Sequence, residues 1–531
     1  MIAFRTVSIL SKFHRLPSTV WSLSSTIEYT ARYKHSSSGN NNPRSGRRES
    51  GNTHHGKFET GMNVDIGKEK DVESESLNIL DDNEYDTIVS SAMHVTNQKL
   101  LNIHNVIVLQ PYVKWGPKKI KDIKPENQLA ESESLIRTLN WNVEVSLKVP
   151  LENMDRKLIF GSGKLDELKQ IINNCNSSGR PITCIFVSKG TLKFVQKLSL
   201  SKYFGIPVMD RYSVVVQILR LHAKTTEAKL QVALAEIPYI WSQLRDMELQ
   251  GSVGQNLYLT DSQKMMLKKR EKRIQIELER LRNHRELLRN KRKQKQYPVI
   301  AIVGYTNCGK TSLIKALTDE ASLQPKNQLF ATLDVTAHAG LLPCRLEVLY
   351  MDTVGFMSDI PTALIECFVA TLEDALEADV IVHVQDVSHD DWILQRTHVE
   401  NTLKNLLKSI RRNDDDVTLD NVINVGNKID LVDENSRDFN DLITVSSTTL
   451  SGMNDLMTKI EDLLLKATDR LKITIRVPMG GAEMQWLYKN SAVTSSDADP
   501  KDNQKILLHV VISRTALDQF KHHFISGGRK G

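Results

Sequence analysis

The segment 304–311 has the residue types and the spacing needed to hold a phosphate group. Its residues, together with the one that follows, are Gly304, Tyr305, Thr306, Asn307, Cys308, Gly309, Lys310, Thr311 and Ser312. An apolar, β-branched run at 297–303 precedes the segment, and a helix-forming run at 312–318 follows it. In this context backbone N–H groups can close around phosphate oxygens at a helix N-terminus. We expect Lys310 to reach the β- and γ-phosphates of a nucleotide and the Thr311 hydroxyl to ligate Mg²⁺.

A second pattern, DxxG, begins at the end of the strand candidate 349–352. Its residues are Asp352, Thr353, Val354 and Gly355. We expect Asp352 to hold Mg²⁺ through a water molecule and the N–H group of Gly355 to contact the γ-phosphate. Gly355 would therefore sense whether the terminal phosphate is present.

A third pattern, NKxD, follows another apolar strand candidate, and a pair of serines closes the next one. The residues are Asn427, Lys428, Asp430, Ser446 and Ser447. A carboxylate at Asp430 can accept hydrogen bonds from N1–H and N2–H₂ of guanine, whereas adenine would leave it unpaired. Asn427 would brace the loop, Lys428 would pack its stem on the base, and Ser447 N–H could meet guanine O6. The three patterns in this order predict a GTP site and disfavour a P-loop kinase or an ATPase.

The elements around these patterns predict an α/β fold class with four folded parts. In chain order these are a small α/β domain at 104–212, a helical hairpin at 213–296, a P-loop GTPase domain at 297–468 and a small α+β domain at 471–526. The segment 160–168 is glycine-rich but lacks the GxxxxGK[ST] spacing. A glycine-permitted turn into a helix is therefore preferred there over a second nucleotide site. Two roles stay open for the C-terminal part: a structural cap on the GTPase domain, or a contact with RNA.

The helical hairpin concentrates the positive charge of the chain. We expect long helices at 213–249 and 262–295, with Gly251 and Gly254 marking the turn. Apolar residues recur every seven positions, as in a short coiled coil, at Leu267, Ile274, Leu281 and Leu288. Residues 264–295 contain 14 Lys/Arg and 4 Asp/Glu, a local charge of +10, in a chain of net charge +6. This excess favours contact with nucleic-acid phosphates over a merely solvated helix face.

The first 48 residues have the composition of a mitochondrial transit peptide. They contain eight Lys/Arg and one acid, Glu28, with many Ser and Thr residues. The alternative is a disordered basic tail, and a secretory signal is disfavoured because no apolar core is present. Residues 49–103 are predicted to be a disordered linker.

Composition excludes several classes of protein. The 531 residues exceed what one hydrophobic core supports, and 40% hydrophobic with 25% charged residues excludes a wholly disordered or collagen-like chain. No apolar run approaches the roughly 18 residues needed to span a bilayer, so no membrane span is expected. The five cysteines form no CxxC pair, which argues against a disulfide scaffold or a zinc site.

From about 104 to 465 the chain resembles the HflX family of ribosome-associated GTPases. The matching segments are GYTNCGKT at 304–311, LFATLD at 329–334, DTVGF at 352–356, ATLED at 370–374 and KLQVALAE at 229–236. With its basic leader and the segment DVTAH at 334–338, it resembles the mitochondrial member of the family found in animals.

This resemblance implies a switch segment around Thr332. Thr332 would ligate Mg²⁺ and close over the γ-phosphate, and Phe330, Ala331 and Leu333 are assigned to the nucleotide site with it. The connection 321–345 is polar and interrupted by proline, which suits an order–disorder switch. Lys310, Thr332 and Gly355 are thus the expected catalytic residues.

Two positions bear on the rate of hydrolysis. Phe356 stands where many GTPases carry a water-orienting glutamine, so we expect slow intrinsic hydrolysis, with water ordered by backbone groups, a cation or a bound partner. Asn307 matches a phosphate-loop asparagine that coordinates K⁺ in related GTPases. K⁺-stimulated turnover is therefore a hypothesis, which equal rates in Na⁺ and K⁺ would contradict; the alternative is a loop-capping residue.

The resemblance also implies a ribosomal partner. Together with the leader, it predicts a GTP hydrolase of the mitochondrial matrix that binds the large mitoribosomal subunit and its rRNA in the GTP state. Splitting of ribosomes for recycling or rescue is the first hypothesis, and late large-subunit assembly is the second. A non-hydrolysing, guanine-nucleotide-dependent RNA scaffold is a third, kept open by Phe356. We expect a monomer off the ribosome. The hairpin loop at 251–254 lacks the Arg-Gly-Pro-Gly-Glu stretch that is common in the family. This difference argues against insertion of the loop into the peptidyl-transferase centre in the family manner.

Overall fold

The computed structural model describes most of the chain from residue 104 onward. The described residues are 104–114, 124–151, 156–249, 261–294, 297–318, 320, 323–358, 364, 372–373, 376–411, 421–432, 439 and 441–526. All of them belong to the unit Asp65–Gly531, and the other unit of the chain, Met1–Val64, lies outside them. The predicted leader, the predicted linker at 49–103 and the hairpin turn at 250–260 also lie outside the described residues.

The first sheet has four parallel strands in the order β2-β1-β3-β4. They are β1 (Asn105–Val113), β2 (Asn142–Leu151), β3 (Cys184–Val187) and β4 (Val208–Asp210), with α4 (Pro125–Thr138), α5 (Ser162–Ser177) and α6 (Phe194–Phe204) between them. Ile107 and Leu109 enter one hydrophobic cluster and Val106 and Val108 another, so β1 is buried on both faces. Burial on both faces is typical of parallel strands and explains why β1 is a continuous apolar run.

The prediction of one helix over 213–249 is wrong. The structure has α7 (Arg211–His222) and α8 (Thr226–Leu249), separated by a break at 223–225. Ala223 has extended backbone (φ −69°, ψ 103°), and the Thr225 hydroxyl accepts from the Ala228 N–H at 3.1 Å, which caps the new helix. The Asp210 side chain caps α7 in the same way through the Ser213 N–H.

The second predicted hairpin helix is confirmed as α9 (Asp261–Gln294), which packs against α8. Leu267 and Ile274 of the predicted heptad are fully buried, and Leu281 is partly buried. Ile274 meets Leu230 and Ile237 of α8. The seven-residue spacing of apolar side chains therefore identifies the face of α9 that packs against α8.

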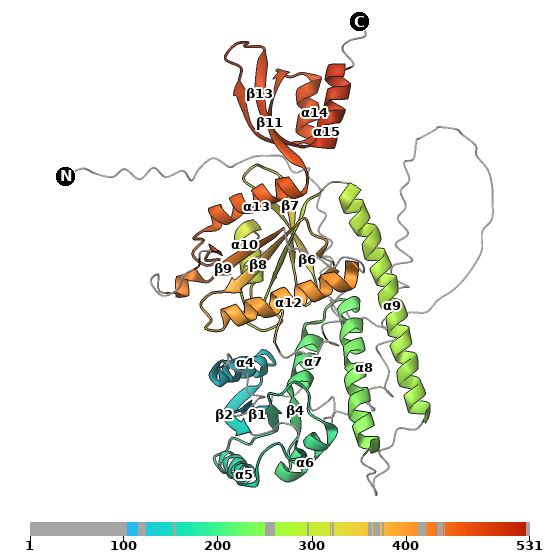
Figure 1. The fold of residues 1–531 in the computed structure, drawn as a ribbon, viewed down its shortest axis with the longest axis vertical. Coiled ribbons are helices and arrows are strands. Elements are labelled where there is room, and N and C mark those ends of the chain that lie inside the picture. Colours follow the sequence, from blue (N-terminus) through green and yellow to red (C-terminus); the bar gives the residue numbers. More distant parts are fainter. Residues whose placement is uncertain are drawn as a thin grey trace, which may run out of the picture. The chain divides into compact units, whose positions relative to one another are not determined.

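The second sheet has six strands in the order β10-β9-β8-β5-β7-β6. They are β5 (Val299–Gly304), β6 (Thr336–Leu341), β7 (Glu347–Asp352), β8 (Val380–Asp386), β9 (Val422–Asn427) and β10 (Ile443–Thr444). The helices are α10 (Lys310–Thr318), α12 (Trp392–Arg411) and α13 (Met453–Ala467). Apolar residues of α10 and α13 join one cluster and those of α12 another, so the helices cover opposite faces of the sheet (Figure 1). The α/β fold class predicted from the sequence is confirmed.

The connection 321–345 contains a strand that its sequence does not predict. Strand β6 pairs antiparallel with β7 from Thr336, opposite Asp352, to Leu341, opposite Glu347. Its side chains are mostly exposed, because the strand is held at the sheet edge by backbone hydrogen bonds rather than by burial. A hydrophobic pattern therefore gives no signal for it, and the predicted switch connection is shorter than expected.

The third sheet is antiparallel, in the order β11-β13-β12. Its elements are β11 (Arg470–Pro478), α14 (Ala482–Asn490), β12 (Ala492–Ala498), β13 (Lys505–Ser513), α15 (Arg514–Phe520) and the π-helical turn Lys521–Ser526. Strand β12, rich in Ser, Thr and Asp and largely exposed, was not predicted. None of the helices in the described ranges combines the length and the apolar character that crossing a bilayer requires. The limits of the four parts stay predictions.

Candidate nucleotide-binding site

The phosphate-loop segment connects β5 to α10, as its sequence predicts. Gly309 has φ +95°, and a Cβ there would overlap the Asn427 amide nitrogen. Asn427 donates from Nδ2 to Cys308 O at 2.9 Å, and its Oδ1 accepts from the N–H and the hydroxyl of Ser447 at 3.1 and 2.9 Å. Asn427 thus joins three loops at one sheet edge, the position expected of a brace.

Lys310 is buried and lies over the loop that precedes it. Its ammonium donates to Gly304 O at 3.3 Å and to Tyr305 O at 3.0 Å. Gly355 approaches the same place, because a Cβ there would lie 2.8 Å from Thr306 Cα and 3.1 Å from Lys310 Nζ. Thr306 and Lys310 of the phosphate loop and Gly355 of DxxG are therefore brought together. Only glycine fits at position 355, because a Cβ would clash with the backbone of Thr306.

Three oxygen ligands predicted for a metal ion converge beside Lys310. Thr311 Oγ1 donates to Asp352 Oδ2 at 2.6 Å, Thr332 Oγ1 donates to the same oxygen at 3.1 Å, and the two hydroxyls lie 3.2 Å apart. Asp352 is 1% exposed, and its Oδ1 has no hydrogen-bond partner among the described residues. Burial raises the pKa of Asp352, whereas the Lys310 ammonium and the threonine hydroxyls oppose that shift. A hard divalent cation would suit this set of hydroxyl and carboxylate oxygens.

A cavity beside the loop is lined by ten of the predicted residues. They are Thr306, Asn307, Gly309, Lys310, Thr311, Ser312, Phe330, Ala331, Thr332 and Gly355. Pro325, Lys326 and Gln328 also line it and were not assigned from the sequence. The sequence feature that could have indicated these three residues is their position in the polar stretch that leads to Thr332.

Four predicted contact residues have other roles in this structure. Cys308, Leu333 and Val354 are buried in hydrophobic clusters. The Thr353 hydroxyl donates to Ile302 O at 2.7 Å, which ties the end of β7 to β5. These residues shape the backbone of the site and do not present side chains to the cavity beside the loop.

The NKxD motif lies at the same sheet edge. Lys428 has left-handed backbone (φ 65°), and its ammonium donates to Asn307 O at 2.9 Å and to Asp386 Oδ2 at 2.6 Å. Asp430 is exposed on the 3₁₀ turn Ile429–Leu431, and Ser446 is fully buried. Asp386 was missed, although an acid at the end of the apolar run 380–386 was a signal for it.

Asn307 belongs to the phosphate loop, and the backbone of Phe356 is hydrogen-bonded to the same loop. Asn307 is exposed with φ 61°, and its Nδ2 donates to Asn327 Oδ1 at 2.8 Å. Phe356 is buried, and its backbone forms two hydrogen bonds with the loop: its N–H donates to Gly304 O at 3.1 Å and its carbonyl accepts from Thr306 N–H at 2.7 Å. The phenyl side chain is therefore packed in the core, and only the backbone of residue 356 faces the loop.

Three family models match consecutive regions of the chain. They are "GTP-binding GTPase N-terminal" at 126–219, "GTP-binding GTPase Middle Region" at 222–292 and "50S ribosome-binding GTPase" at 299–428. The last of these covers the phosphate loop, the DxxG motif and the first two residues of NKxD.

Several known proteins are similar over most of the chain. "Putative GTP-binding protein 6" of Homo sapiens is 42% identical over 429 residues, which are 79% of this chain and 81% of that protein. "GTPase HflX" of Caldanaerobacter subterraneus subsp. tengcongensis is 32% identical over 396 residues, 72% of this chain and 87% of that protein. A crystal structure of a GTP-binding protein from Sulfolobus solfataricus with GDP matches 68% of this chain and 99% of that one, at 22% identity and a TM-score of 0.37.

Proposed function

The chain belongs to the HflX family of ribosome-associated GTPases, and we propose that it acts on mitochondrial ribosomes. In this proposal it binds the large mitoribosomal subunit and its rRNA in the GTP state and splits ribosomes for recycling or rescue. GTP hydrolysis then times its release. The mitochondrial location is supported by the transit-peptide composition of residues 1–48.

The observation that carries the nucleotide part of the proposal is the convergence of Thr311, Thr332 and Asp352. The three residues come from the phosphate loop, the switch segment and the end of β7, and their oxygens lie within 3.2 Å of one another in each contact. They would hold Mg²⁺, which neutralises charge on the transferred phosphoryl group. Thr332 can occupy this position only when the switch segment is ordered. Asn307 is the proposed contact for K⁺.

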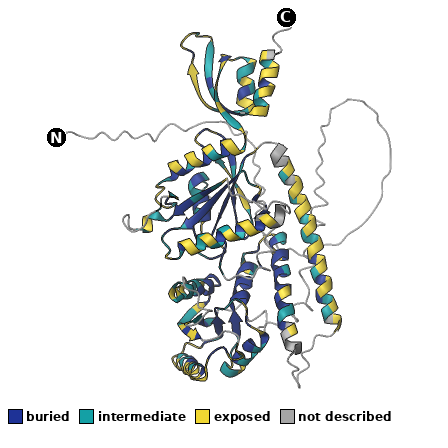
Figure 2. Ribbon diagram, viewed as in Figure 1, coloured by how far each residue is buried: buried dark blue, intermediate teal, exposed yellow. Residues whose placement is uncertain are grey.

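The ribosomal contact is proposed for the first half of α9. Four exposed cations there form no ion pair within the described part of the chain: Lys268, Lys269, Lys272 and Arg273. Figure 2 shows α9 exposed along most of its length. Exposed lysine and arginine side chains bind phosphates of a nucleic acid without reading its sequence.

The second half of α9 contributes less to this surface than its charge suggests, because acids already pair with its arginines. The ion pairs are Arg282–Glu373 at 2.6 Å, Arg285–Glu227 at 2.8 Å and Arg289–Glu377 at 3.1 Å. Counting charges along the sequence therefore overestimates the field that α9 offers to a partner.

Reversing two of the free cations, with Lys268→Glu and Arg273→Glu, is expected to weaken binding to ribosomal RNA. The slope of log affinity against log salt should become shallower by about 0.9 for each phosphate group that the variant no longer binds, on the scale of duplex DNA. Filter binding across a salt series measures this slope. Lys459→Glu with Lys466→Glu on α13 changes the net charge equally and is the control. An unaltered slope in the α9 variant would mean that these residues are only a solvated face.

Sedimentation with purified mitoribosomal subunits tests the function itself. We expect the protein to travel with the large subunit in a non-hydrolysable GTP analogue and to stay unbound in GDP. Identical profiles with both nucleotides would contradict the proposal.

Gradient profiles after depletion separate the two ribosomal roles. An excess of intact monosomes supports splitting, whereas an immature large subunit supports assembly. Multiple-turnover phosphate release stimulated by ribosomal subunits would exclude the non-hydrolysing scaffold.

A further inference from the structure

Four residues from distant parts of the chain form one hydrogen-bonded group, termed the Glu131 cluster: Glu131, Arg211, Tyr305 and Ser358. Glu131 Oε1 accepts from the Tyr305 hydroxyl at 2.7 Å, and Oε2 accepts from Arg211 Nη2 at 2.8 Å. Arg211 Nη2 also donates to Ser358 O at 3.3 Å, and the Ser358 N–H donates to the Tyr305 hydroxyl oxygen at 2.8 Å. The cluster joins α4 and α7 to the phosphate loop and to the segment after DxxG.

Arg211 and Tyr305 of the cluster are buried, and Glu131 and Ser358 are partly buried. Arg211 is 3% exposed, and the side chain of Glu131 is 20% exposed. Burial raises the pKa of the Tyr305 hydroxyl well above its ordinary value, and the Glu131 carboxylate adds to the shift. Tyr305 therefore remains a hydrogen-bond donor, and the Glu131 carboxylate is matched by the Arg211 guanidinium. Removing Glu131 would take the carboxylate away from the buried Arg211 guanidinium, and it would leave the Tyr305 hydroxyl with Ser358 Oγ, at 3.1 Å, as its acceptor.

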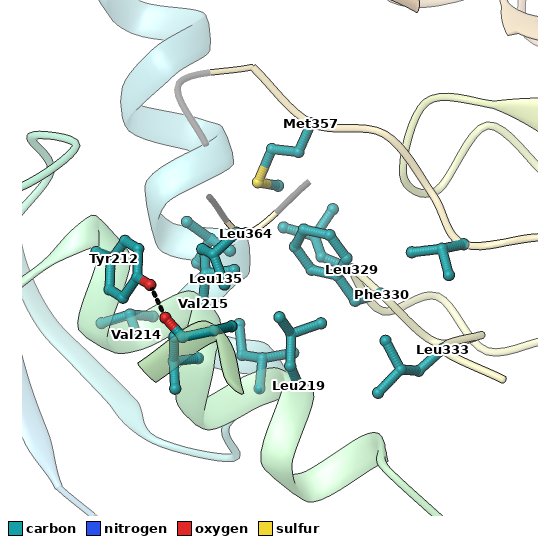
Figure 3. Packing of buried hydrophobic residues seen from close by; sticks show 14 of the residues in the cluster. Leu135, Tyr212, Val214, Val215, Leu219, Leu329, Phe330, Leu333, Met357 and Leu364 are labelled. Carbon is teal, nitrogen blue, oxygen red and sulfur yellow. Dashed lines mark hydrogen bonds between the residues drawn. The ribbon is translucent and has the colours of Figure 1, made fainter. Parts of the chain in front are cut away.

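Apolar packing holds the same elements together around the cluster. Leu135 of α4 and Val215 and Leu219 of α7 belong to one hydrophobic cluster with Phe330 and Met357 (Figure 3). The segment that leads to Thr332 and the segment after DxxG thus both pack against α4 and α7. Their positions therefore depend on residues outside the six-stranded second sheet.

The phenyl side chain of Phe356 cannot order a water molecule by hydrogen bonding. Residue 356 can therefore influence the reaction only through the position of its backbone beside the phosphate loop. That backbone is tied to Gly304 and Thr306 on either side of Tyr305, and Ser358 adds a tie to the Tyr305 hydroxyl itself. Through Tyr305 and Ser358, the pair Glu131–Arg211 therefore acts on the Gly355–Phe356 backbone.

We propose that Glu131 and Arg211 are positioning residues for GTP hydrolysis, supplied by α4 and α7. They hold Tyr305 and Ser358 so that the Gly355–Phe356 backbone lies against the phosphate loop in the geometry that the reaction needs. The inference rests on the GTPase activity and adds a part of the machinery that lies outside the P-loop motifs.

Single-turnover hydrolysis by the full-length protein tests this role. Glu131→Ala is expected to lower the rate of the chemical step by about tenfold or more, because small misplacements of reacting groups have large effects on rate. The dissociation constant for GDP should change by no more than about twofold, because switch contacts to the γ-phosphate are absent with GDP. Glu131→Gln keeps an acceptor for Tyr305 but loses its charge, so its rate should lie between wild type and Glu131→Ala.

Two control variants separate positioning from stability. The first control is Glu133→Ala. Glu133 is on the same helix as Glu131 and is similarly exposed, at 21%, but its carboxylate binds Arg137 at 2.9 Å and not the phosphate loop. Glu236→Ala removes a buried carboxylate that binds Arg220 through two hydrogen bonds of 2.6 and 2.7 Å. Both should keep the wild-type rate at temperatures where thermal melting shows them folded.

The outcomes that overturn the inference are specific. They are an unchanged rate in Glu131→Ala, an equal loss of rate in Glu236→Ala, or a loss of GDP affinity that matches the loss of rate. Stimulation by ribosomal subunits is measured in parallel on the wild-type protein. Its absence counts against the proposed ribosomal function only, since the single-turnover comparison needs no ribosome.

Discussion

Lys310→Ala is expected to lower GTP turnover by at least about a hundredfold, the size of effect seen when one preorganised donor is removed from an active site. The Lys310 ammonium is buried and already fixed by the carbonyls of Gly304 and Tyr305. It is therefore held beside the loop that would surround the phosphates. The positive charge of Lys310 also lowers the pKa of Asp352 against the effect of burial, so its loss removes a counter-charge from the metal ligands.

Phosphate release and GTP affinity, measured together, check this expectation. Lys315→Ala is the matched control, because Lys315 is on the same helix but does not line the cavity beside the loop. If Lys310→Ala turned over GTP at a rate close to that of Lys315→Ala, the assignment of Lys310 would be wrong.

The sequence predicts the phosphate loop well because the loop is local. Its residues are consecutive, and a strand before them and a helix after them fix their geometry. The same is true of DxxG and NKxD, each of which begins at the end of a strand, β7 or β9, and both strands belong to the parallel part of the second sheet. The ends of parallel strands share an edge, so motifs separated by many residues are brought together by the topology.

The elements that the sequence does not predict depend on contacts rather than on hydrophobic patterns. Strand β6 is mostly exposed and exists because β7 offers it backbone partners. The break between α7 and α8 depends on the Thr225 cap and on hydrogen bonds from the Lys224 N–H and the Thr225 hydroxyl to the distant Asp334 carboxylate. In both cases the decisive interaction involves a backbone group, which every residue has and which the sequence pattern cannot reveal.

The Glu131 cluster shows the same limit at the level of the site. Tyr305 and Glu131 are 174 residues apart, and nothing in the sequence around Glu131 distinguishes it from Glu133. Two of the acids that pair with α9, Glu373 and Glu377, are 91 and 88 residues from their arginines. Long-range pairs of charged side chains therefore require the folded structure, even where the motifs that they support are evident from the sequence.

Asp430→Asn is expected to exchange the base specificity of the site. A carboxylate accepts from two donors of guanine, whereas an amide offers one donor and one acceptor, which match the carbonyl oxygen and N1–H of xanthine. A site built around hydrogen bonds rejects a ligand that leaves them unmade, so GTP affinity should fall by about a hundredfold or more. Affinity for xanthosine triphosphate should rise by a similar factor. Asp430 is exposed on its 3₁₀ turn, so the substitution should not disturb the fold.

Competition between GTP, ATP and xanthosine triphosphate for one labelled nucleotide measures the exchange. Asp455→Asn removes an exposed acid from α13 and controls for the change in net charge. The Lys428 ammonium stays bound to Asp386 in both variants, so the loop that carries residue 430 keeps its anchor. Unchanged GTP affinity in Asp430→Asn would mean that guanine is selected elsewhere, because a carboxylate that contacts both base donors cannot be replaced by an amide without loss of one of them.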